Sequence, residues 1–95
     1  MSFYLVRIEL HRAQPKDYDN LHDAMQSVGF HLRITEKGVT YQLPTAEYAI
    51  NSEQPTGQIL NAANAAAGKT GKRFSVVVAK CAEFMQFNLT PIAPP

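Results

Sequence analysis

The chain has 95 residues, 45% of them hydrophobic, and a formal net charge of +1. This length and composition predict one folded domain and exclude a disordered chain. A charge so close to zero excludes a strong overall field toward nucleic acid or membranes, so any such contact needs a local basic patch.

The single cysteine, Cys81, excludes an internal disulfide. The first residues lack the basic and small-residue pattern of a signal peptide, and no apolar run approaches the roughly 20 residues that span a bilayer. These features predict a cytoplasmic protein without a membrane segment.

Residues 2–10 alternate between apolar and polar, which predicts a strand with one buried face: Tyr4, Val6, Ile8 and Leu10. Residues 15–28 change to helical spacing. Pro15 suits the first turn of a helix, and Gly29 suits the position just after its end.

Residues 30–43 form two alternating runs joined at Glu36-Lys37-Gly38, which predicts a β-hairpin. The second run is interrupted at Pro44. Before it the odd-numbered residues are apolar, and after it Ala46, Tyr48 and Ile50 are apolar on even numbers. We interpret this change of phase as a β-bulge in one long strand, with both halves facing the same core.

Residues 56–70 predict a second helix, with Thr56 as its N-cap and alanines on the face toward a sheet. Residues 72–82 predict the last strand. The order β-α-β-β-α-β predicts an α+β protein, specifically a ferredoxin-like sandwich whose four-stranded antiparallel sheet carries both helices on one face. This domain spans residues 1–82, and the apolar, proline-rich tail 83–95 is expected to form an extra strand or to be partly disordered.

The densest basic cluster is Lys69, Lys72 and Arg73, with Arg12 as an addition. These residues are the candidates for binding RNA phosphates, although such clusters also serve simply as a solubilising surface. The three histidines are widely spaced and match no metal-ligand pattern, so neither a metal nor a cofactor is predicted.

Four stretches carry a resemblance: YLVRIELH, DYDNLHDAMQSVGF, TYQLPTAEY and AAAGKTGKRFSVVV. With these, the chain from Tyr4 to Val78 resembles a family of small bacterial proteins grouped with GhoS, the endoribonuclease antitoxin of a type V toxin–antitoxin pair. The resemblance implies a ferredoxin-like fold and action on the transcript of a small membrane toxin. It assigns no catalytic residue.

The leading hypothesis is therefore a GhoS-like antitoxin that binds RNA. A further part of this hypothesis is that the protein cleaves the RNA as a metal-independent endoribonuclease. Such cleavage needs a base, an acid and a cation near the phosphate. His11 and His31 are the candidates for the first two roles, and Arg33 or Arg12 for the third. The alternative is a non-catalytic, ferredoxin-like homodimer that binds a partner through its sheet or its tail, and the sequence leaves open which of the two applies.

Overall fold

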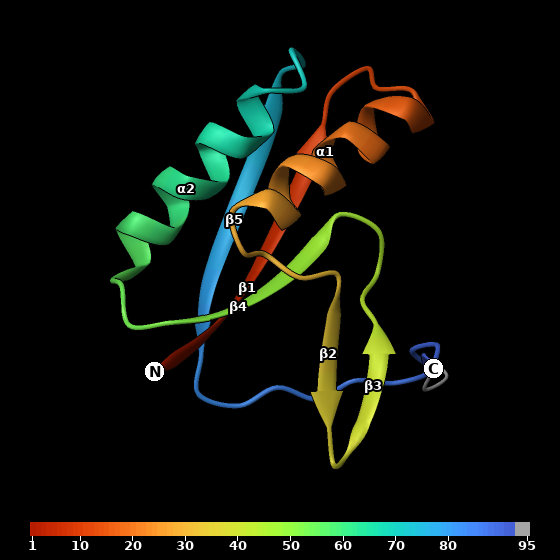
Figure 1. Cartoon of the computed structure of the whole chain (residues 1–95), viewed down its shortest axis with the longest axis vertical. Coiled ribbons are helices and arrows are strands. Elements are labelled where there is room, and N and C mark those ends of the chain that lie inside the picture. The colour runs from red at the N-terminus through yellow and green to blue at the C-terminus, as the bar shows by residue number, and fades with distance from the viewer. Residues whose placement is uncertain (93–95) are drawn as a thin grey trace.

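The structure is a computed structural model that describes residues 1–92 (Figure 1). Its elements in chain order are β1 (Ser2–Leu10), α1 (Pro15–Ser27), β2 (Arg33–Glu36), β3 (Val39–Gln42), β4 (Glu47–Ser52), α2 (Thr56–Gly68) and β5 (Phe74–Cys81). The chain is thus an α+β protein with two helices and antiparallel strands, as the sequence predicted.

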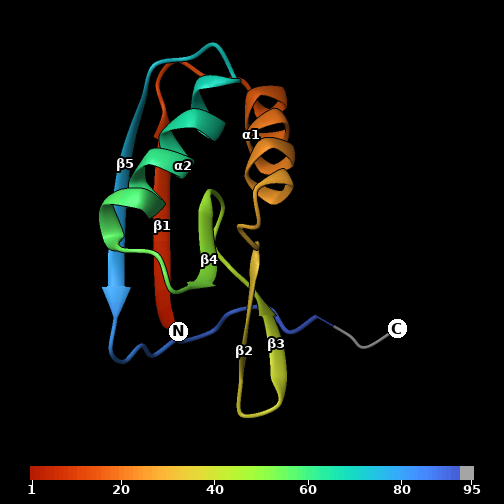
Figure 2. The same ribbon diagram turned by 60° about the vertical axis from the view of Figure 1, so that its left-hand side comes forward.

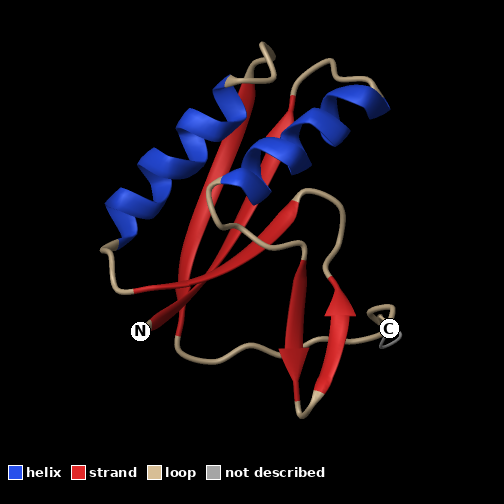
Figure 3. Ribbon diagram, in the orientation of Figure 1, coloured by secondary structure: helices blue, strands red, loops and turns tan. Residues whose placement is uncertain are grey.

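Strand β1 lies at the centre of a three-stranded antiparallel sheet of order β4-β1-β5. Both helices cover one face of this sheet (Figure 3). The four predicted inward residues of β1 are all buried there, and they pack against Leu21 and Met25 of α1 and against Ile59 and three alanines of α2. Small side chains let α2 approach the sheet closely, which explains why an alanine-rich helix contributes to the core.

Helix α1 ends in a Schellman motif. The N–H of Gly29 donates to the carbonyl oxygen of Gln26 (3.1 Å), and the N–H of Phe30 donates to that of Met25 (3.0 Å). Gly29 has a φ of +93°, a conformation that glycine adopts at little cost. The motif turns Phe30 back into the core, where its side chain is fully buried. Helix α2 begins differently from the prediction: its N-cap is Pro55, and Thr56 is already helical.

Strands β2 and β3 form the predicted hairpin. Lys37 and Gly38 at its turn both have positive φ, as in the two-residue turn that matches the twist of a hairpin. The expected four-stranded sheet is nevertheless wrong, because this hairpin is a separate two-stranded sheet. A single bridge, between His31 and Ala49, joins the segment before β2 to β4.

The cause is the break at Pro44, which is larger than the predicted one-residue bulge. Between β3 and β4 the chain makes a tight turn, in which the N–H of Glu47 donates to the Pro44 carbonyl oxygen (3.0 Å) and Ala46 has a φ of +63°. The turn directs β3 away from β4, and β2 follows β3 because the two are paired. The prediction that the ladder is interrupted here is confirmed.

The predicted single core is also incorrect. Leu43 packs with Ile34 and Ala49 in a second apolar cluster, whereas Ala46 and Tyr48 belong to the main core under the helices. The second cluster lies on the opposite face of β1, beneath its half-buried residues Phe3 and Leu5. The two apolar phases around Pro44 therefore correspond to two cores on opposite sides of the sheet.

The described part of the tail lies against this second cluster (Figure 2). Phe84 stacks on Phe3 with ring centroids 5.1 Å apart, and Leu89 packs nearby. The tail also pairs with β3, through the N–H of Gln42 to the Thr90 carbonyl oxygen (2.9 Å) and the N–H of Ile92 to that of Thr40 (2.8 Å). The expectation for residues 93–95 lies outside the described residues.

Neither described helix is both long and apolar enough to cross a membrane.

Together, the hairpin and tail cover only the part of the second sheet face around Phe3 and Leu5, so the part around Arg7 and Glu9 stays open.

Candidate phosphate-binding site

Two loops meet at one end of the sheet: the β1–α1 loop, residues 11–14, and the α2–β5 loop, residues 69–73 (Figures 1 and 2). The N–H of His11 donates to the carbonyl oxygen of Arg73 (2.8 Å), which fixes the two loops side by side. An open hollow of about 710 Å³ lies between them, lined by Glu9, His11, Arg12, Lys72 and Arg73 among others. The structure thus brings one predicted catalytic residue together with three predicted RNA-binding residues.

Lys69, the fourth predicted RNA-binding residue, caps the C-terminal end of α2 in the same loop. It does not line the hollow, although it adds positive charge at this end of the molecule. Its position next to the last helical carbonyls also fits the ordinary role of a lysine that complements the helix dipole.

The side chain of His11 is held by β5. Its Nε2 atom lies 2.9 Å from the Oγ atom of Ser75, a hydrogen-bonding distance whose donor depends on the tautomer. Glu9 lies directly opposite Ser75 in the β1–β5 register and lines the same hollow as His11, so a carboxylate-bearing residue is the strand neighbour of the serine that holds the imidazole. The sequence alone did not point to Ser75, because its role depends on the register between strands far apart in the chain.

The charge of the hollow is positive but partly balanced. Lys72 Nζ lies 3.7 Å from Asp17 Oδ2, and the same carboxylate oxygen accepts the backbone N–H of Gln14 (2.8 Å). Partly exposed pairs of this kind add little stability. Within residues 1–92 neither Arg12 nor Arg73 has an ion-pair partner, and both are exposed, so these two guanidinium groups are available to an anion.

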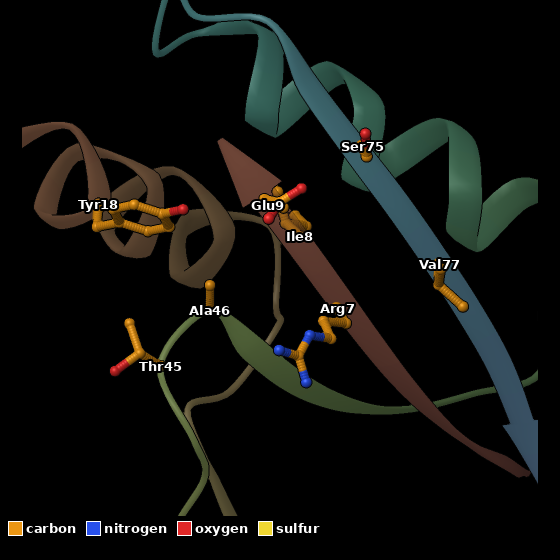
Figure 4. Close-up of a pocket in the computed structure, with 8 residues that line it drawn as sticks. All are labelled: Arg7, Ile8, Glu9, Tyr18, Thr45, Ala46, Ser75 and Val77. Atoms are coloured by element: carbon orange, nitrogen blue, oxygen red, sulfur yellow. The ribbon is translucent and has the colours of Figure 1, made fainter. Parts of the chain in front are cut away.

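A second hollow of about 450 Å³ continues along the open face of the sheet (Figure 4). It shares Glu9 with the first hollow and is lined further by Arg7, Tyr18, Ser75 and Val77. Figure 4 shows Arg7 between β1 and β4, and Tyr18 reaching from α1 toward β1. The open face thus adds one more cation, on the strand that carries Glu9, with its guanidinium group directed toward β4.

The structure does not bring His31 and Arg33 into this site. Both line another hollow, of about 470 Å³, next to the stacked rings of Phe3 and Phe84. His31 pairs with Ala49, which pairs with Leu5, and His11 lies six positions beyond Leu5, just after the end of β1. At the rise of a strand this places the two histidines about 20 Å apart, so they cannot act on the same phosphate within one chain.

His22 has a structural role. Its Nδ1 atom lies 2.7 Å from the hydroxyl of Tyr48, which is fully buried. Burial lowers the pKa of His22, although the nearby carboxylates Asp19 and Asp23 act in the opposite direction. Burial also raises the pKa of Tyr48, with a smaller contribution from Tyr18. The tyrosine therefore stays protonated and can donate to the neutral imidazole.

We expect the free energy of unfolding to fall as the pH is lowered below 6.5, the ordinary pKa of histidine. In this range the unfolded chain takes up a proton on His22 that the folded chain resists, because its pKa is lower when folded. Urea unfolding measured at several pH values between about 5 and 8 measures this slope.

The variant His22→Asn should lose part of the slope, and His31→Asn, at an exposed position, should retain it. If His22→Asn shows the same pH dependence as the parent protein, the proton linkage at His22 is wrong.

No group of three or more His, Cys, Asp or Glu residues within residues 1–92 is arranged to hold a metal ion. A comparison with protein-family models and with curated proteins finds no match for this chain.

Proposed function

We propose that this protein binds RNA, with the hollow between the β1–α1 and α2–β5 loops as its phosphate-binding site. The observation that carries the proposal is the convergence of Arg12, Lys72, Arg73 and His11 on one open hollow in a chain whose overall charge is nearly neutral. Guanidinium groups without ion-pair partners bind phosphate oxygens in a bidentate manner. The resemblance to the GhoS group supports RNA as the source of the phosphate.

We also propose that the fold is a ferredoxin-like sandwich in which β3 and β4 are the two halves of the third strand. The bridge between His31 and Ala49 supports this interpretation, because it places the segment before β2 beside β4. In this interpretation the β2–β3 hairpin corresponds to the edge of the ferredoxin-like sheet, which the turn at Pro44 separates from β4. An antitoxin acting on a toxin transcript in the cytoplasm is the cellular role that the resemblance suggests.

The chemistry of the site supports a further step, cleavage of the bound RNA without a metal. One group removes the proton of a ribose 2′-hydroxyl, whose oxygen attacks the phosphorus and displaces the 5′ oxygen as a cyclic phosphate forms. A second group gives the leaving oxygen its proton. Glu9 and His11 flank Ser75 and can fill these two roles, while Arg73 and Arg12 neutralise the phosphate charge. This revises the pairing of His11 with His31.

The proposal predicts salt-sensitive binding of a labelled single-stranded RNA. With about four phosphate contacts, affinity should fall roughly 50-fold between about 50 and 200 mM salt, because each contact contributes about 0.7 to the logarithmic slope. The variants Arg12→Ala and Arg73→Ala should each lower the slope by about 0.7. Fluorescence anisotropy at several salt concentrations measures both quantities.

Lys37→Gln is the matched control, since Lys37 lies at the exposed hairpin turn, outside the hollow. Lys37→Gln should leave the slope of the salt dependence unchanged. If it lowers the slope as much as Arg12→Ala and Arg73→Ala do, binding follows the overall charge of the protein and not the hollow. No binding at all at low salt instead favours the alternative, a non-catalytic homodimeric module.

A further inference from the structure

The outer edge of β5 is unpaired. The strand ends the sheet order β4-β1-β5, and no other described residue pairs with that side of it (Figure 2). Its ladder with β1 runs without a bulge from Phe74 to Cys81. An edge of this length offers a row of free backbone groups to any other strand.

The hydrogen bonds of β1 identify which backbone groups are free. The N–H of Ile8 donates toward β4, to the Ala46 carbonyl oxygen, whereas the N–H of His11 donates toward β5, to that of Arg73. Because these directions alternate along a strand, the odd-numbered residues of β5 face β1. The even-numbered residues direct their N–H and C=O groups outward: Phe74, Val76, Val78 and Lys80.

The edge also lacks the features that keep monomers apart. Natural edge strands are usually short or carry charges, prolines or bulges. The six residues Phe74–Ala79 contain no charge and no proline. In the middle of the strand Val77 is 66% exposed on the open face of the sheet, an unusual position for a β-branched apolar side chain.

We propose that two copies of this chain form a dimer by antiparallel pairing of β5 with β5 of the partner, about a two-fold axis at Val77. This register is self-complementary. It matches Val76 with the partner's Val78 and Phe74 with the partner's Lys80, so each outward residue meets another outward residue. All the free groups of the edge are then hydrogen-bonded, and no like charges face each other within β5.

The same register fixes the neighbours on the open face. Val77 meets the partner's Val77 as a pair without hydrogen bonds, whose Cα atoms lie about 4.5 Å apart. This contact covers the exposed valine. Ala79 meets the partner's Ser75, so the two Ala79 residues are about 14 Å apart. A cysteine at position 77 is therefore expected to cross-link the dimer, and a cysteine at position 79 is not. The dimer does not depend on RNA binding, and its test uses no RNA.

The test is disulfide formation in a Cys81→Ser background. Val77→Cys places two thiols within the Cα range of a disulfide, about 4.4–6.8 Å, and should oxidise to a covalent dimer. Ala79→Cys is the matched control on the same exposed face and should remain uncross-linked. Sedimentation should give the parent protein twice the chain mass of 10.5 kDa.

The variant Val77→Lys places two ammonium groups opposite each other and should weaken the dimer about tenfold, while Val39→Lys, at an exposed position on the hairpin, should not. A parent protein that stays monomeric at high concentration overturns the proposal and leaves the edge to a different partner. Equal cross-linking of Ala79→Cys and Val77→Cys overturns the register.

Discussion

Replacing Phe30 with alanine is expected to lower the free energy of unfolding by about 3–5 kcal/mol, the usual cost of removing a fully buried phenyl ring. Phe30 follows the Schellman motif of α1 and packs in the main core with Met25, whose carbonyl oxygen accepts its N–H. Removal of the ring leaves a cavity where the end of α1 is anchored. Urea unfolding measures the change, and a domain of this size should lose roughly 4–8 °C of melting temperature per kcal/mol.

Phe84→Ala is the matched comparison in the second core. Phe84 is half-buried and stacks on Phe3, so its loss should cost much less, about 1–2 kcal/mol. The difference between the two variants measures how unequally the two cores contribute. If Phe84→Ala destabilises the protein as strongly as Phe30→Ala, the hairpin and tail are as important to the fold as the helices.

Local sequence patterns predicted most of the elements. The alternation in residues 2–10 gave the buried face of β1, and Pro15 and Gly29 marked the beginning and the end of α1. The hairpin turn at Lys37-Gly38 was equally clear, because two consecutive positive φ angles favour glycine in a short loop. These features depend on neighbouring residues only, so the rest of the chain does not alter them.

The sheet could not be predicted in the same way. A change of phase at Pro44 fits either one bulged strand facing one core or two strands facing two cores. The choice depends on whether an apolar layer exists on the other side of the sheet. That layer is built from Ile34, Leu43 and Ala49 together with Phe84 of the tail, and no local pattern connects these residues.

The candidate site shows the same limit. The basic cluster of the α2–β5 loop, with Arg12 as its addition, is predicted from the sequence. The structure adds that His11 lines the same hollow as Arg12, Lys72 and Arg73. The sequence pairs His31 with His11 because both are imidazoles, yet His31 bridges to Ala49 within β4, whereas His11 follows the end of β1, about 20 Å away. Ser75 emerges as the partner of His11, and Glu9 as the neighbour of Ser75, only once the β1–β5 register is known.

Replacing His11 with alanine is expected to slow RNA cleavage by about 10²–10⁴-fold, the usual contribution of a general acid or base. RNA affinity should change little, because Arg12 and Arg73, the residues proposed to bind the phosphate, remain in place. Single-turnover cleavage of a labelled RNA, measured at saturating protein, separates the rate of the chemical step from binding. Glu9→Gln should slow the same chemical step, since it removes the other group proposed for the acid–base roles.

His31→Ala is the matched control for this prediction, since it removes the same kind of side chain from an exposed position about 20 Å away. It should cleave at the parent rate. A loss in His31→Ala together with full activity in His11→Ala transfers the catalytic site to the hollow beside Phe3 and Phe84. Equal rates in the parent and both variants show that these imidazoles take no part in cleavage, which overturns the assignment of His11. Comparing these two variants therefore shows which of the two hollows, the one lined by His11 or the one lined by His31, carries the cleavage activity. The charge of the molecule alone does not distinguish between them.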